Sequence, residues 1–263
     1  MNIYIINLPA QIERSVFQEK QFSRLGLAFT RVDAVSVKDV SDEYYQKVAF
    51  DWERPLSRAE VSCYLSHQSL WQRVISENAP ALILEDDAYL SDDLPKLLCA
   101  FENLNVNYIN LETRCRKKII SKNSEREFSG YGLKQLYYGG TGAAAYIIWP
   151  AAAQKLLDKE RQSGIALADA QICRTKLGSA WQLDSAAVIQ LDCCDHYQMA
   201  SPHKTTSTLA QTRFEKEAAS KTKKTFKWRR IIAQFNLGVI QLSAVFGVTE
   251  RKEVVPKVSS FSV

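Results

Sequence analysis

The strongest constraint on this chain is an apolar run that leads directly into three consecutive acids, residues 81–87 (ALILEDD). The run predicts a buried β-strand that ends in a cluster of carboxylates. Carboxylates this close repel one another and are costly to desolvate, and a hard divalent cation such as Mg²⁺ or Mn²⁺ offsets both effects. Because ligands bind at the carboxyl ends of strands in α/β sheets, Glu85, Asp86 and Asp87 predict a metal–diphosphate site. The alternative interpretation is a solvated acidic turn.

The composition is that of an ordinary globular protein. The 263 residues are 46% hydrophobic and 24% charged, which suits one domain or one and a half. No stretch reaches the roughly 18 apolar residues that a membrane span needs. The apolar N-terminus lacks the basic region and cleavage site of a signal peptide, so we expect a first strand there. Six cysteines without C-x-x-C spacing predict reduced thiols in a cytoplasm and argue against a zinc site.

The charge is unevenly distributed along the chain. Residues 204–263 carry twelve Lys/Arg and four acids, a net charge of +8, whereas residues 1–203 carry −3. We therefore expect a domain over 1–203 and a basic amphipathic helical region over 204–263. Aromatic and aliphatic residues among the lysines suit an anionic membrane surface, and a helix packed on the domain is the alternative. No nucleic-acid-binding module accompanies the charge, so we expect no nucleic acid partner.

Hydrophobic periodicity predicts alternating strands and helices. An S-x-x-E capping box, residues 57–60, opens the helix before the acidic strand. The alternation predicts an α/β fold with a mostly parallel sheet covered by helices on both faces. Residues 113–134 have little pattern and are interpreted as a long surface loop. The expected strands are 2–7, 28–32, 81–85, 108–111, 145–149 and 186–191, and the expected helices include 10–25, 57–77 and 151–161.

Several other residues are candidates for chemistry. His67, in the helix that leads to the acidic strand, is either a core residue or part of the site. His196 follows the last expected strand and is either a metal ligand or solvated. Asp169 is a candidate general base, although an aspartate at a helix start also suits an N-cap. The glycine-rich segment 139–142 either approaches a ligand or forms a turn, and the chain has no P-loop or dinucleotide fingerprint.

Taken together, the motifs resemble glycosyltransferase family 25, which includes bacterial lipooligosaccharide galactosyltransferases and collagen galactosyltransferases. The resemblance extends over about residues 1–195, and its most specific part is the S-H-containing helix followed by L-E-D-D-A. The stretches that carry it are 6–8 (INL), 13–14 (ER), 32–34 (VDA), 57–67 (SRAEVSCYLSH), 84–88 (LEDDA) and 140–148 (GTGAAAYII).

The resemblance implies a GT-A-like, Rossmann-type fold, a UDP-sugar donor, Mn²⁺ or Mg²⁺, and inversion at the anomeric carbon. It implies a catalytic role for Asp169 as general base and leaves the role of His67 open. The chain departs from the family pattern in having E-D-D instead of a plain D-x-D, and in lacking a proline before Asp169. The metal ligands would be Glu85, Asp86 and Asp87, with His196 as a further candidate. The residues near the nucleotide would be Asn7, Leu8, Arg14, Asp33, Ala34, Ser66, Gly140, Thr141 and Gly142.

The resemblance implies an enzyme that moves a hexose, in the first instance galactose, from a UDP-hexose to a lipooligosaccharide or another glycolipid or oligosaccharide acceptor. The basic tail places it at the inner face of the cytoplasmic membrane. Three alternatives remain: a glucosyltransferase of the same family, a metal-dependent phosphohydrolase, and a non-catalytic sugar- or nucleotide-binding module. The small number of histidines, three, argues against the phosphohydrolase.

Overall fold

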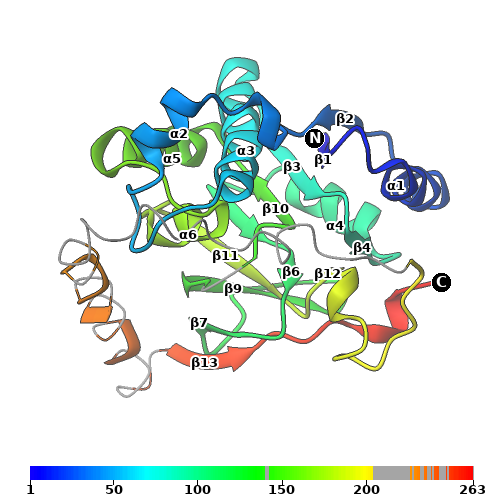
Figure 1. Ribbon diagram of the computed structural model, residues 1–263. Helices are drawn as coiled ribbons and strands as arrows, with labels where there is room; N and C mark the ends of the chain where they lie inside the picture. Colours follow the sequence, from blue (N-terminus) through cyan, green and yellow to red (C-terminus); the bar gives the residue numbers. More distant parts are fainter. Residues whose placement is uncertain are drawn as a thin grey trace.

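The computed structural model describes residues 1–139, 142–203, 226, 228–231, 234–235, 238, 240–242, 247 and 249–262. Its centre is a ten-stranded sheet flanked by helices (Figure 1). The strands of this sheet, in spatial order, are β13 (Thr249–Glu253), β7 (Lys117–Ser121), β9 (Tyr131–Tyr138), β11 (Ala180–Asp184), β5 (Tyr108–Asn110), β10 (Ala145–Ile148), β3 (Ala81–Glu85), β1 (Asn2–Asn7) and β2 (Thr30–Asp33), with β8 (Arg126–Phe128) paired to β9.

A second sheet has three strands, each of which follows a strand of the main sheet along the chain. It has the order β4 (Ala88–Leu90), β12 (Val188–Gln190) and β6 (Glu112–Thr113). The helices are α1 (Ile12–Leu25), α2 (Asp42–Val48), α3 (Arg58–Glu77), α4 (Leu94–Phe101), α5 (Pro150–Ser163) and α6 (Ala168–Arg174), and the 3-10 turns are η1 (Val37–Asp39), η2 (Leu191–Cys193) and η5 (Val258–Ser260).

The predicted α/β class with a mixed, helix-flanked sheet is confirmed, although parallel pairing is less extensive than expected. In the main sheet the parallel pairs are β1–β2, β1–β3 and β5–β11. The pairs of β10 with β3 and β5, and those among β7, β8, β9, β11 and β13, are antiparallel. Short turns connect β7, β8 and β9. A short turn reverses the direction of the chain, which explains the antiparallel pairing in this part of the sheet. This mixed, helix-flanked sheet is consistent with the GT-A-like, Rossmann-type fold that the resemblance implies.

Both faces of the sheet are buried, and successive strand residues alternate between two cores. In β3, Ile83 joins the core under α3, α5 and α6, whereas Leu82 and Leu84 join the core under α1 and α4. This alternation follows from the two-residue period of a strand. The apolar run before the acids is therefore buried on both sides, as the sequence predicts. It places the acids at the carboxyl end of a central strand.

Helix α3 runs directly into β3 and begins where the capping box predicts. The Ser57 side chain accepts a hydrogen bond from the Glu60 amide, and the Glu60 carboxylate accepts one from the Ser57 amide. The helix ends at Asn78, which adopts a left-handed conformation. This short connection places one face of α3 against the carboxyl end of β3.

Helix α1 packs differently from the prediction. Hydrophobic periodicity predicts that Ile12 and Val16 face inward, but they are 69% and 41% exposed. The buried face instead carries Gln18 and Gln21, whose amides donate to the carbonyl oxygen of Ala88 at 2.8 and 3.0 Å. The helix thus satisfies buried backbone groups next to the acidic cluster, a nonlocal role that hydrophobic periodicity cannot reveal.

Two further expectations need correction. The segment 113–134 is not a loop, because it contains β7, β8 and the start of β9. Residues 249–262, expected in a helical tail, instead supply β13 at the sheet edge and a buried Ser260 that hydrogen-bonds Tyr131 and Ser91. Within the helices that the structure describes, none is long and apolar enough to cross a membrane. Residues 204–225 of the basic tail lie outside the described residues.

Candidate active site

A cavity of about 370 Å³ opens where α3 meets the carboxyl ends of β1 and β3. Its walls combine apolar side chains with four acids and two arginines, so it suits a ligand that has both an apolar and an anionic part. The lining residues are Ile6, Leu8, Arg14, Ala34, Val35, Val37, Ala59, Ser62, Cys63, Ser66, His67, Glu85, Asp86, Asp87, Arg114, Gln190 and Asp192.

The middle acid of the cluster, Asp86, is committed to the protein. Its Oδ1 accepts a hydrogen bond from Arg14 at 2.7 Å, and its Oδ2 accepts one from the Asn7 amide at 2.8 Å. Burial raises the pKa of Asp86 in spite of the Arg14 charge. The structure thus brings Asn7, Arg14 and Asp86 together in a buried contact that links α1 and β1 to the end of β3.

The first acid, Glu85, is fixed by a chain of polar contacts. The Trp71 indole donates to the Tyr146 hydroxyl at 2.9 Å, and that hydroxyl lies 2.9 Å from His67 Nδ1. His67 Nε2 lies 3.2 Å from Glu85 Oε1, while the Gln190 amide donates to Oε2 at 3.1 Å. Burial opposes ionisation of Glu85, but the hydrogen bond and charge of His67 outweigh it and lower the pKa. Glu85 is held as an oriented carboxylate.

The third acid, Asp87, has no such support. Its Oδ1 is buried and has no hydrogen-bond partner within the described part of the chain. Burial and then the charge of Glu85 raise the pKa of Asp87 to about 7. A buried carboxylate oxygen without a partner is costly, and a divalent cation between Glu85 and Asp87 would remove that cost. These two residues therefore fit a hard metal ion, whereas Asp86 does not offer a free oxygen to the same degree.

An arginine in the cavity wall balances the charge of the acids. Arg114 lines the cavity and donates a hydrogen bond to Asp192 at 3.1 Å. Burial acts to lower the pKa of Arg114, but the charges of Asp192 and other nearby acids outweigh it and raise the pKa. A cation next to a metal site is suited to a diphosphate. Sequence reasoning missed Arg114, since it lies in the segment interpreted as a loop.

Behind the cavity, a second acidic group surrounds Gly142. This glycine has φ +99°, and a Cβ at this position would lie 2.2 Å from Glu112 Oε1, so no other residue fits. Its amide lies 3.4 Å from Asp169 Oδ2, and Asp169 Oδ1 accepts from the Ala170 amide at 2.6 Å. Asp169 is at the start of α6 as expected, and burial raises its pKa. It does not line the cavity, although the charge of Glu85 acts on it.

Glu112 is a buried carboxyl that sequence reasoning did not select, although an acid after β5 was a signal for it. Both of its oxygens lack hydrogen-bond partners among the described residues. Burial raises its pKa to about 8, the charge of Lys118 opposes the shift, and Glu85 adds to it. Glu112 is therefore mostly a neutral acid near pH 7.

We expect Glu112→Gln to flatten the pH dependence of stability. Between about pH 4.5 and 8 the folded protein keeps a proton on Glu112 that the unfolded chain releases, so stability falls as pH rises. Replacing this acid should abolish a loss of about 2 kcal/mol in the free energy of unfolding between pH 6 and 8. Chemical denaturation at four pH values measures the slope, with exposed Glu125→Gln as the control. Equal slopes in both variants would contradict the burial of Glu112.

The remaining predicted residues divide into two groups. Leu8, Ala34 and Ser66 line the cavity, and the Ser66 hydroxyl accepts a hydrogen bond from the Val35 amide at 2.9 Å. Asp33 and His196 do not line it. The Asp33 side chain is 66% exposed and faces Arg31, and His196 contacts Glu253 at 2.9 Å. Gly140 and Thr141 lie outside the described residues.

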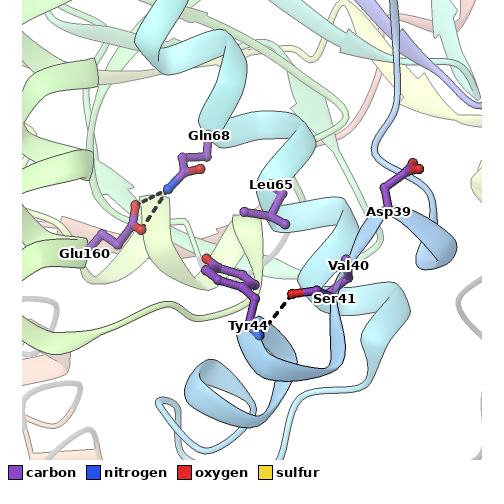
Figure 2. Close-up of a pocket in the computed structure, with 7 residues that line it drawn as sticks. All are labelled: Asp39, Val40, Ser41, Tyr44, Leu65, Gln68 and Glu160. Atoms are coloured by element: carbon purple, nitrogen blue, oxygen red, sulfur yellow. Dashed lines mark hydrogen bonds between the residues drawn. The ribbon is translucent and has the colours of Figure 1, made fainter.

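A second hollow, of about 340 Å³, lies between α2, α3 and α5 (Figure 2). Figure 2 shows the Gln68 amide directed at the Glu160 carboxylate, to which it donates at 2.7 Å, and Glu160 also accepts from Tyr64. At 3.6 residues per turn, Leu65 projects from α3 at about 160° from His67, and Gln68 projects at about 100° from it. This hollow is thus separate from the acidic cavity, and its carboxylate is already paired.

Comparison with known sequences places this geometry in a family. The model of "Glycosyltransferase family 25 (LPS biosynthesis protein)" matches residues 1–171, which include α3, the acids and Asp169. The lipooligosaccharide biosynthesis protein Lic2B of Haemophilus influenzae is 28% identical over 167 residues, or 58% of this chain and 61% of that protein. LgtB of Neisseria meningitidis serogroup B, a lacto-N-neotetraose biosynthesis glycosyltransferase, is 25% identical over 60% of this chain and 62% of its own.

The matched region is thus less than two thirds of these relatives. A glycosyltransferase 25 family member of Anopheles gambiae is 33% identical over 96 residues, which are 33% of this chain and 16% of that protein. Among solved structures, A197 from STIV covers 72% of this chain and 83% of its own with 12% identity and a TM-score of 0.37. The family match spans well over half of the sequence and includes most of the residues that line the acidic cavity. The chain therefore belongs to glycosyltransferase family 25.

Proposed function

We propose that the protein is an inverting glycosyltransferase that moves a hexose, galactose in the first instance, from a UDP-sugar to a lipooligosaccharide acceptor. The observation that carries the proposal is the pair Glu85 and Asp87 at the end of β3, with a buried, unpartnered oxygen on Asp87 beside the cavity. Family membership supports glycosyl transfer, and the roles of Lic2B in lipooligosaccharide biosynthesis and of LgtB in lacto-N-neotetraose biosynthesis support the acceptor class.

The cavity walls offer a place for each part of the donor. Leu8, Ala34 and Val35 form an apolar side on which a uracil ring would lie. Ser66 fixes the backbone of Val35 from α3, which keeps that wall rigid. Arg114, on the acidic side, would bind the diphosphate oxygens.

Glu85 and Asp87 would hold Mn²⁺ or Mg²⁺, which when bound neutralises the departing diphosphate. His67 acts on Glu85 through its 3.2 Å contact, so we assign it a positioning role. For the base that takes the proton of the acceptor hydroxyl we propose Asp169, whose pKa is raised by burial.

The test is release of UDP from a panel of UDP-sugars by the purified full chain with Mn²⁺. We expect turnover with UDP-galactose that increases when a lipooligosaccharide acceptor is added. Preference for UDP-glucose would revise the donor. Release of inorganic phosphate, or binding of nucleotide without any turnover, would contradict a transferase and favour a phosphohydrolase or a binding module respectively.

We also propose that the tail brings the enzyme to anionic lipid at the inner face of the cytoplasmic membrane. The described residues between 226 and 242, orange in Figure 1, are helical. Arg229 donates to the carbonyl oxygens of Phe50 and Trp52 and so ties this segment to the domain. Several apolar side chains among its described residues are exposed, as suits a segment that contacts a lipid interface. They are Trp228, Ile231, Phe235 and Leu242, between 52% and 72% exposed.

Replacing Trp228, Ile231 and Phe235 together by serine should weaken binding to phosphatidylglycerol-containing vesicles by roughly 100-fold, because burial of these side chains in the lipid interface is lost. Co-sedimentation measures the binding. Ile12→Ser with Val16→Ser, which removes exposed apolar side chains from α1, is the control. Unchanged vesicle binding by the triple variant would overturn the proposal.

A further inference from the structure

The cavity contains ligand atoms of a second chemical kind beside the hard-metal pair. Cys63, His67 and Glu85 each offer one ligand atom, and the three atoms lie within 4.8 Å of one another. We propose that these residues form a site for a thiophilic divalent cation such as Zn²⁺, which shares Glu85 with the hard-metal site. The site goes beyond the proposed function, but its regulatory consequence rests on that function.

The fold brings these three residues together at a rigid position. Cys63 and His67 are four residues apart on α3, so both side chains project from the same face of the helix. Glu85 ends β3, which is buried on both faces and follows α3 after a short turn. The site therefore exists without any rearrangement of the backbone.

The donor set decides which cation is favoured. Mg²⁺ and Mn²⁺ prefer oxygen ligands, whereas a thiolate and an imidazole favour Zn²⁺. Three protein ligands with a fourth position open to solvent are typical of an accessible zinc site, and all three residues line the cavity. The absence of C-x-x-C spacing argued against a zinc site. That motif detects only pairs of cysteines, whereas this site uses a single cysteine.

Neighbouring contacts already orient two of the ligands. His67 Nδ1 lies 2.9 Å from the Tyr146 hydroxyl, which leaves Nε2 directed at Glu85. The Gln190 amide holds the other oxygen of Glu85. Binding requires loss of the Cys63 thiol proton to solvent and an imidazole with its hydrogen on Nδ1, where the Tyr146 oxygen accepts it.

The shared ligand makes the two cations exclusive. A thiophilic ion that takes Glu85 leaves Asp87 without its partner for Mn²⁺ or Mg²⁺. We therefore expect Zn²⁺ to inhibit the metal-dependent reaction even with Mn²⁺ in excess, and a chelator selective for Zn²⁺ to restore it. This behaviour follows from the geometry without a separate regulatory domain.

Titration of the purified, metal-free full chain with Co²⁺ tests the site directly. Wild type should bind one ion with a near-ultraviolet thiolate-to-cobalt charge-transfer band, and Zn²⁺ should displace it. Cys63→Ser should abolish the band and weaken Zn²⁺ binding by roughly 100-fold. Cys99→Ser, at an exposed cysteine on α4, is the matched control and should keep the band.

Two results would overturn the inference: no band in the wild type, or a band that persists in Cys63→Ser. Binding of Mn²⁺ to Cys63→Ser, measured by electron paramagnetic resonance, shows whether the variant keeps its fold. Sugar transfer without the cobalt band would contradict the zinc site alone. The band without any sugar transfer would contradict the proposed function alone.

Discussion

Asp87→Asn should lower kcat/KM for metal-dependent UDP-sugar turnover by about 10³-fold, on the order of 4 kcal/mol of transition-state stabilisation. An amide keeps the size of the side chain but removes the charge that would bind a hard cation beside Glu85. The expected cause is loss of the metal, so titration with Mn²⁺ should show a parallel loss of affinity.

The same variant should fold at least as well as the wild type at pH 8. Asp87 is a buried acid whose pKa is raised to about 7, and it repels Glu85, so its replacement relieves an unfavourable charge in the metal-free protein. Loss of activity with an unchanged or raised Tm would locate the effect in the chemistry. Full turnover in Asp87→Asn would remove the acid pair from the mechanism and, with it, the main support for the proposed function.

The sequence predicted the parts of the fold that local rules control. The capping box of Ser57 and Glu60 and the apolar run of β3 both appear where expected, because each depends on neighbours in the chain. Strand β7 was missed because its Lys118 reads as a solvent-exposed residue. Lys118 is in fact 1% exposed and donates to Asn110 and Gln182, from two other strands. Only the sheet order brings these partners together.

The site shows the same division between local and nonlocal information. The three acids were predicted as one metal-binding group, since nothing in a run of E-D-D distinguishes its members. Their roles separate only through other elements: Asp86 contacts Arg14 of α1, and Glu85 contacts His67 of α3, while Asp87 has neither. Asp86 and Asp87 lie in the turn between β3 and β4, where adjacent acids meet different surroundings.

The different contacts of the three acids lead to the second large predicted effect, which is a change in the stability of the protein. Asp86→Asn should destabilise the protein by about 3 kcal/mol, a fall of roughly 6–12 °C in Tm, because it removes the carboxylate charge that pairs with the buried Arg14 guanidinium. Burial raises the pKa of Asp86 despite Arg14, so the intact pair itself contributes little net stability. A double variant with Arg14→Met should therefore recover most of the loss, since it removes both buried charges.

Thermal and chemical denaturation of the two single variants and the double variant complete this cycle. Asp87→Asn is the matched comparison, because it removes a neighbouring acid of the same size that has no ion-pair partner among the described residues. Equal losses of stability in Asp86→Asn and Asp87→Asn would contradict the distinct roles assigned to them. A loss confined to Asp86→Asn would show that one acid in the run maintains the fold, which leaves its neighbours available for the cation.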